Sequence, residues 1–141
     1  MTHRLDRLLK IRRAGQTRER GRWDQARQEF GERSGEAGAK AASASEATEQ
    51  LKALGRGELN LARLRLGGEG REALRVGAEH AMAAARDAER RAEEQRSQLE
   101  RAHRDVRAIE KLTERNALTA KARVAASETR ESDDRPRAAR P

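Results

Sequence analysis

Residues 74–115 read LRVGAEHAMAAARDAERRAEEQRSQLERAHRDVRAIEKLTER, and apolar side chains recur in them every 3.5 residues. Ten of the eleven positions on this repeat are apolar, and the exception is a glutamine. A repeat of this period, held for about five heptads, keeps one seam of a helix against a partner helix. These residues therefore predict a coiled-coil helix. Its seam positions are Leu74, Ala78, Ala81, Ala85, Ala88, Ala92, Gln95, Leu99, Ala102, Val106 and Ile109.

The positions between the seam residues are almost all charged. Opposite charges stand four residues apart, as in Asp87 with Arg91 and Glu100 with Arg104. Each such pair stabilises a helix by about 0.2–0.5 kcal/mol. We therefore expect the outer face of this helix to be solvated.

Composition excludes a compact globular domain. The chain has 141 residues, of which 40% are charged and 35% hydrophobic, and it holds one Trp, one Phe and no Tyr. Much of the hydrophobic share is alanine, so too little apolar surface is present for a globular core. An elongated, all-α protein is the expectation.

Cysteine is absent, and no uncharged run approaches the roughly 20 apolar residues of a membrane span. The N-terminus lacks the apolar region of a signal peptide. These features favour a cytoplasmic protein in a reducing compartment.

A second, weaker seam predicts a first helix over residues 3–54. Five glycines interrupt it, at Gly15, Gly21, Gly31, Gly35 and Gly38. Each costs about 1 kcal/mol relative to alanine in a helix interior, so we expect this helix to depend on a partner. Its seam positions are Leu5, Leu9, Arg12, Gln16, Glu19, Trp23, Ala26, Phe30, Arg33, Ala37, Lys40, Ala44, Ala47, Leu51 and Leu54.

A glycine-rich stretch at 55–72 predicts the reversal between the helices, with glycines supplying positive φ angles there. Two long helices joined in this way pack as an antiparallel hairpin. The predicted fold is thus a long two-helix antiparallel coiled-coil hairpin, residues 1–126, with helix 2 at 73–126. Residues 127–141 lack a period and contain two prolines, which predicts a disordered C-terminal tail. Leucines within the reversal form either a further helical turn or an apolar cap over it: Leu59, Leu61, Leu64 and Leu66.

Positive charge gathers at the two ends of the chain. Residues 1–30 carry nine bases and four acids, and residues 117–141 carry six bases and four acids. Both termini of a hairpin lie at the same end, which we call the open end. It is expected to hold about seven of the eight net positive charges.

No pattern predicts a catalytic, cofactor or metal site. The run Gly67-Gly68-Glu69-Gly70-Arg71 lacks the Lys and Ser or Thr of a phosphate-binding loop. The three histidines share no metal-ligand spacing, and the carboxylates suit a solvated helix face better than acid-base chemistry. We expect a protein that is not an enzyme and has no small-molecule substrate.

Trp23 and Phe30 lie seven residues apart on the first seam. One interpretation is that they fill the hairpin core, and the other is that they are partly exposed anchors for a protein partner. Leu74, at the start of the second helix, has the same two interpretations.

Two short motifs resemble a known family. Residues 106–115, VRAIEKLTER, are similar to the C-terminal signature of the FliJ family of bacterial flagellar export proteins, whose injectisome counterparts are the YscO proteins. Residues 5–12, LDRLLKIR, resemble the opening of that family. The chain departs from the family at 116–120, where NALTA replaces the usual run of Arg and Gln.

The resemblance implies a non-enzymatic stalk. Such proteins insert the open end of their hairpin into the hexameric ring of the flagellar export ATPase and promote its assembly. They also contact the membrane export gate and escort export chaperones, so the resemblance places this chain at the cytoplasmic face of the inner membrane, reached only through the export apparatus.

The family role suggests which residues meet partners. Basic side chains of the open end are expected to face the ring, and Leu74 with its neighbours to meet the gate. Trp23, Phe30, Ile109 and Leu112 complete the expected partner-binding set. The basic residues are Arg4, Arg7, Arg12, Arg13 and Arg115.

Two other functions stay open at this point. A generic cytoplasmic coiled-coil scaffold predicts self-association. A basic helical hairpin that binds nucleic acid is suggested by a pI near 11.0, but the lack of aromatic stacking residues and the interleaved acids disfavour it.

Overall fold

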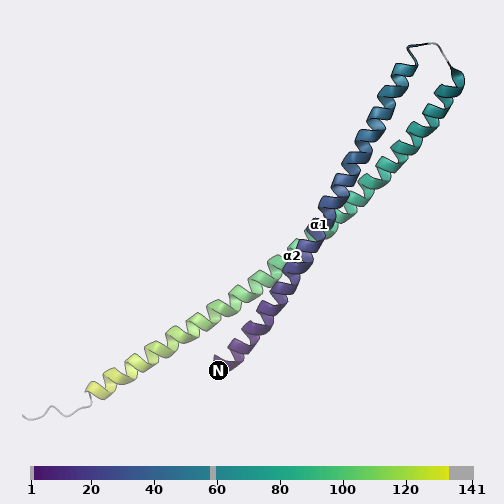
Figure 1. The fold of residues 1–141 in the computed structure, drawn as a ribbon. Coiled ribbons are helices and arrows are strands. Elements are labelled where there is room, and N and C mark those ends of the chain that lie inside the picture. The colour runs from purple at the N-terminus through teal and green to yellow at the C-terminus, as the bar shows by residue number, and fades with distance from the viewer. Residues whose placement is uncertain (1, 58–59, 134–141) are drawn as a thin grey trace, which may run out of the picture. The chain divides into compact units, whose positions relative to one another are not determined.

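The computed structural model describes residues 2–57 and 60–133, which form two long helices (Figure 1). Helix α1 spans Thr2–Leu54 and helix α2 spans Leu61–Asp133. The described residues contain no strand. The predicted all-α, two-helix hairpin is thereby confirmed.

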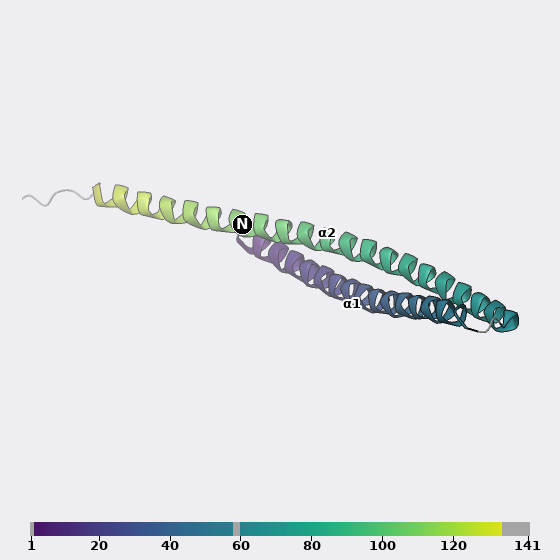
Figure 2. The same cartoon turned by 90° about the horizontal axis from the view of Figure 1, so that it is seen from above.

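The chain divides into two units, each built from a segment of α1 packed against a segment of α2. The terminal unit comprises Met1–Thr17 with Glu100–Pro141, and the turn unit comprises Arg18–Leu99. Figure 2 shows the two helices running antiparallel within the turn unit. There Glu29 pairs with Arg91, whereas Leu51, later in α1, meets Gly67, earlier in α2.

The α2 seam lies where the 3.5-residue repeat predicts it. Ten of its eleven residues are buried or half-buried, and Leu74 is the exception at 41% exposure. Only small side chains are buried in the turn unit as described, namely Ala37, Ala78, Ala81 and Ala88; Val106 is the buried residue of the terminal unit. The core is therefore thin, because each alanine methyl removes little apolar surface from water.

The α1 seam is also recognisable. Eleven of its fifteen positions are buried or half-buried, while Arg12, Arg33, Lys40 and Leu54 are exposed. The three charged exceptions are residues whose side chains reach water from the edge of a seam. The helix continues through all five of its glycines.

The reversal is shorter than the stretch predicted at 55–72, because α2 already begins at Leu61. Asn60 caps this helix: its side-chain Oδ1 accepts a hydrogen bond from the Arg63 backbone N–H at 3.2 Å, and its carbonyl accepts one from Leu64 at 3.0 Å. Leu61, Leu64 and Leu66 thus belong to the first turns of α2, and Leu59 lies outside the described residues.

The density of glycine at the reversal predicts positive φ angles there, and this prediction is wrong. No described glycine has a positive φ. Gly67 instead lies where α2 approaches α1, since a Cβ at this position would stand 3.1 Å from Leu51 Cδ1. Packing against α1 therefore holds Gly67 in a helix that its propensity disfavours.

The far end of α2 also differs from the prediction. The helix does not end near 126 but continues to Asp133, so residues 127–133 of the predicted tail are helical. Three of the seven residues, Glu128, Arg130 and Glu131, are good helix formers, and Thr129 Oγ1 donates to the Ala125 carbonyl one turn earlier in α2. Residues 134–141 lie outside the described residues.

Candidate protein-binding surfaces

The first turns of α1 carry three basic side chains on the outside of the terminal unit. Arg4, Arg7 and Lys10 are exposed, and none of them has an ion-pair partner within the described residues. The α1 seam follows Leu5 and Leu9, so these three residues fall on positions that face water. Their charges are available to an acidic partner.

Arg12 and Arg13, by contrast, reach across to α2. Arg12 Nη1 lies 3.1 Å from Asp105 Oδ2, and Arg13 Nη2 lies 2.8 Å from Glu110 Oε1. Gln16 Nε2 donates to His103 Nδ1 at 2.6 Å beside them. These contacts are exposed, and exposed ion pairs contribute about 0–1 kcal/mol each. Their main effect is to align α1 with α2 in the terminal unit.

The α2 residues of the signature motif, 106–115, differ in their exposure. Ile109 is half-buried, Leu112 is 46% exposed, and Arg115 is exposed without an ion pair among the described residues. Of these three, Leu112 and Arg115 are accessible to a partner.

Two exposed apolar residues of α1 lie outside the predicted partner-binding set. Leu8 is 40% exposed and Ile11 is 61% exposed. They lie one turn apart beside Arg7 and Lys10, so an apolar ridge runs along the basic face. The sequence does indicate that these two apolar residues lie beside the seam, because both fall outside its Leu5–Leu9 positions.

Helix α2 continues past the part of it that α1 covers. Every residue from 114 to 131 is exposed, including Leu118 at 66% and Val124 at 56%. A shallow groove marks the last paired turns, lined by Leu9, Arg13, Glu110, Thr113, Glu114 and Ala117.

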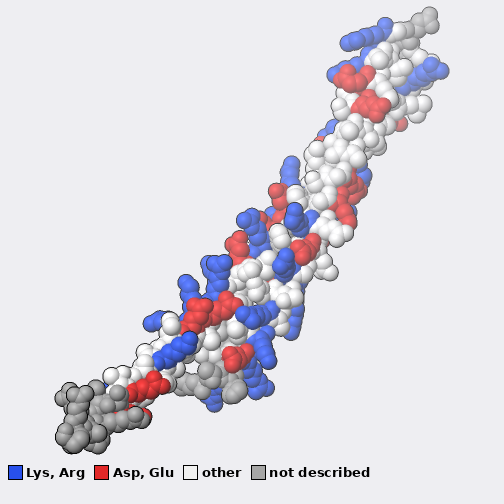
Figure 3. All heavy atoms as spheres, turned by 60° about the vertical axis from the view of Figure 1, so that its left-hand side comes forward, with Lys and Arg blue, Asp and Glu red and all other residues white. Residues whose placement is uncertain are grey.

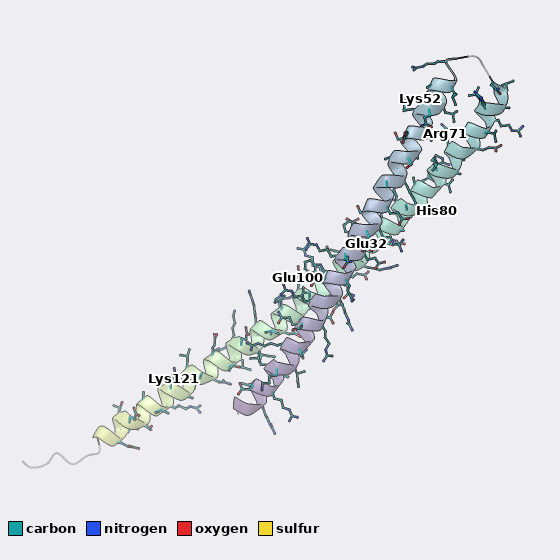
Figure 4. The ribbon with its side chains drawn as sticks, viewed as in Figure 1. Glu32, Lys52, Arg71, His80, Glu100 and Lys121 are labelled. Carbon is teal, nitrogen blue, oxygen red and sulfur yellow. The ribbon has the colours of Figure 1, made fainter. Side chains whose placement is uncertain are left out.

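A second surface lies in the turn unit, next to the reversal. A groove of about 450 Å³ separates the last turns of α1 from the early turns of α2. Lys52 and Arg71 stand on the two helices in this region (Figure 4). Because Gly67 and Gly70 have no side chains, the α2 side of the groove is hollowed. Its lining residues are Ala47, Gln50, Leu51, Leu54, Gly67, Gly70, Arg71, Ala73 and Leu74.

Leucines dominate the surface around this groove. Leu61 is 80% exposed, Leu66 is 70% exposed and Leu54 is 47% exposed. Together with Leu74 they give the turn unit an apolar surface of the kind that marks protein-binding sites. Leu74 was predicted to contact a partner, and its exposure and place in the groove leave it free to do so.

The charged residues beside this surface are largely paired with one another. Arg75 donates to both carboxylate oxygens of Glu72, at 3.0 and 2.6 Å, and also pairs with Glu79. The hydrogen bond from Arg75 lowers the pKa of the Glu72 carboxyl from its ordinary value. These contacts keep both side chains occupied within α2.

Trp23 and Phe30 belong to the turn unit. Both are half-buried. The Arg27 guanidinium lies 5.5 Å from the centroid of the Trp23 ring, a cation–π distance. Their half-burial is compatible with packing and with partial access for a partner.

Charge divides unevenly between the two units. The terminal unit has 16 Lys and Arg against 9 Asp and Glu, a net charge of +7, whereas the turn unit has 16 against 15, a net charge of +1. Figure 3 shows that bases and acids are interspersed on the visible face rather than sorted into a stripe of one sign. The excess in the terminal unit arises from the unpaired bases of α1 and from the C-terminal residues.

Within residues 2–57 and 60–133, no group of three His, Asp or Glu side chains is placed to hold a metal ion. Neither α1 nor α2 contains an apolar stretch long enough to cross a membrane.

Comparison with known proteins assigns the family. The family described as "Flagellar FliJ protein" matches residues 1–139, nearly the whole chain. No curated protein and no solved structure gave a significant match. The family match agrees with the two-helix hairpin and with the motifs at both ends of the chain. The chain belongs to the flagellar FliJ protein family and is a flagellar export-related protein.

Proposed function

We propose that this protein is a non-enzymatic stalk of the flagellar type III export apparatus. Its terminal unit enters the hexameric ring of the export ATPase and promotes ring assembly and activity. Its turn unit contacts the membrane export gate, and the protein also meets export chaperones. The stalk thereby works at the cytoplasmic face of the inner membrane.

The observation that carries this proposal is the unpaired positive charge of the terminal unit. Arg4, Arg7 and Lys10 make no internal ion pairs in the described residues, and the unit has a net charge of +7. Charge of one sign on an entering surface guides association with an acidic partner and sets its register. The exposed Leu8 and Ile11 add apolar contacts beside these charges.

The apolar surface of the turn unit supports the second half of the proposal. Its groove and exposed leucines, Leu74 among them, suit contacts with another protein. Because the two surfaces lie in different units, a variant in one should leave the other intact.

The first test measures the turnover and oligomeric state of the cognate export ATPase with and without the protein, at physiological salt. Faster turnover and a larger hexamer fraction are expected with the wild-type chain. The double variant Arg4→Glu/Arg7→Glu should lose both effects, because it replaces two attractive charges with repulsive ones.

The matched control is Arg56→Glu/Arg63→Glu, which changes the net charge equally at exposed positions of the turn unit. It should stimulate the ATPase like the wild type. Equal stimulation by both double variants would discard the role of the terminal unit. For the second surface, Leu74→Asp should abolish binding to the export gate without changing ATPase stimulation.

A further inference from the structure

The middle of α1 contains a segment with almost no packing of its own. Residues 31–45, GERSGEAGAKAASAS, include three glycines, three serines and no apolar side chain larger than alanine. Ala37 is buried and Ala41 and Ala44 are half-buried, whereas every other residue of the segment is exposed. We call these residues the glycine segment.

None of the three glycines in this segment is needed to let another part of the protein pack closely against α1. A Cβ built on Gly31, Gly35 or Gly38 meets nothing within 4 Å. A Cβ built on Gly67, by contrast, would stand 3.1 Å from Leu51 Cδ1, so the absence of a side chain at Gly67 does permit a close contact between the helices. The glycines of the segment therefore weaken the helix without permitting any contact, each by about fivefold in the helix–coil equilibrium.

Side-chain interactions do not compensate for this weakness. The ion pairs of the segment, Arg33 with Glu36 and Lys40 with Glu36, remain within α1. The Ser43 hydroxyl donates to the Ala39 carbonyl, a local bond that offers no added helix stability.

The interhelix ion pair of the turn unit and its closest leucine contact lie outside the segment. Glu29 pairs with Arg91 on one side of it, and Leu51 meets Gly67 on the other. Between these points the buried residues of the facing part of α2 are all alanines, namely Ala78, Ala81 and Ala88, while Val76 is half-buried and Met82 is 40% exposed. Glu32 at the start of the segment and His80 on the facing part of α2 are labelled in Figure 4. The segment itself contributes only the methyl groups of Ala37, Ala41 and Ala44 to this packing.

We propose that the glycine segment opens locally, losing its helical hydrogen bonds while α2 and the flanking parts of α1 stay folded. Local opening of this kind is expected where buried apolar contacts are few and backbone hydrogen bonds are exposed. Because the flanking parts of α1 stay packed on α2, the segment acts as a compliant link between two ordered parts of the helix. This inference does not depend on the proposed export function.

Hydrogen exchange of the full-length chain, followed by mass spectrometry of its peptides, tests the proposal. After correction for intrinsic rates, peptides within 31–45 should exchange at least about tenfold faster than peptides within 18–30 and 75–90. Uniform exchange along α1, or equally fast exchange of 75–90, would overturn it, because the segment would then open only together with its surroundings.

A variant series supplies the second arm. The triple variant Gly31→Ala/Gly35→Ala/Gly38→Ala should slow exchange of the segment by on the order of a hundredfold, from about fivefold per glycine. Gly21→Ala is the control, because its Cβ also meets open space but lies outside the segment. It should leave the exchange of 31–45 unchanged. Unaltered exchange in the triple variant would contradict the proposal.

Discussion

Gln95 is the polar residue in the α2 seam, and its side-chain Oε1 is buried with no hydrogen-bond partner in the described part of the chain. A buried acceptor that lacks a partner loses its bond to water and gains nothing in exchange. Single polar residues at such seam positions are known to fix the register of coiled coils at the expense of stability. The seam on its N-terminal side, from Ala78 to Ala92, is alanine throughout, so that part offers little else to define register.

Replacing Gln95 by leucine should therefore stabilise the protein. We expect Gln95→Leu to raise the free energy of unfolding by about 1–3 kcal/mol, because it removes the desolvated amide and adds apolar burial. Urea unfolding followed by circular dichroism measures the change. Gln98→Leu, on the exposed face of the same helix, is the control and should change it little. A loss of stability in Gln95→Leu would show that the amide is satisfied in solution.

Asn60 decides where α2 begins. Its side chain accepts a hydrogen bond from the Arg63 N–H, one of the donors that a helix start leaves unpaired. Asn60→Ala should lower the free energy of unfolding by about 1 kcal/mol. Asn116→Ala, at an exposed position inside α2, should be neutral or slightly stabilising, since alanine is the better helix former. Equal thermal shifts in the two variants would argue against the cap.

At the scale of the helices, the seam of α2 could be predicted because its outer positions are charged and its repeat is nearly unbroken. The seam of α1 was harder to follow, since Arg12, Arg33 and Lys40 occupy seam positions yet reach solvent. The predicted start of α2, at residue 73, is later than the observed one because Gly67, Gly68 and Gly70 are residues typical of chain reversals. Of these, Gly67 lies against Leu51 of α1, and Asn60 is the sequence signal that marks the true boundary.

Gly67 and Gly68 allow that packing effect to be measured on adjacent residues. A Cβ at Gly68 meets nothing within 4 Å, whereas one at Gly67 stands 3.1 Å from Leu51 Cδ1. Gly68→Ala should stabilise the protein by about 1 kcal/mol through helix propensity alone. Gly67→Ala should stabilise the protein by less than this, or destabilise it, because the Leu51 side chain must move to make room for the new methyl group. Chemical unfolding of the two variants side by side decides the matter, and a larger gain for Gly67→Ala would contradict the contact.

At the scale of the whole molecule, the uneven charge of the two units was predictable from the sequence, because it needs only the hairpin topology. The exposed ridge of Leu8 and Ile11 was not, because a 3.5-residue repeat identifies the seam positions but does not indicate how exposed the apolar residues beside them are. The internal pairing of Arg12 and Arg13 also required coordinates, since Asp105 and Glu110 are distant in sequence. A repeat pattern identifies which face is buried but does not show which surface charges meet across it.

The charge of the terminal unit makes a kinetic prediction. If it guides entry into an acidic ring, the association rate with the export ATPase should fall steeply as salt rises toward about 0.15 M, where charges are screened over roughly 8 Å. The dissociation rate should change less. Stopped-flow or surface-based kinetics at several salt concentrations measure both rates. In Arg4→Glu/Arg7→Glu the salt dependence should weaken or reverse, and an unaltered slope would indicate that other residues guide the encounter.

The half-burial of Trp23 gives the molecule a spectroscopic label of its own. The chain has one Trp and no Tyr, so its intrinsic fluorescence comes from one indole on α1, with the Arg27 guanidinium 5.5 Å from the ring centroid. Separation of the helices would expose this ring and shift its emission to longer wavelength. Quenching by iodide would then differ from quenching by neutral acrylamide, because the nearby arginine attracts the anion. Pairing of α1 with α2 can thus be followed optically in the unlabelled protein, alone or with a partner added.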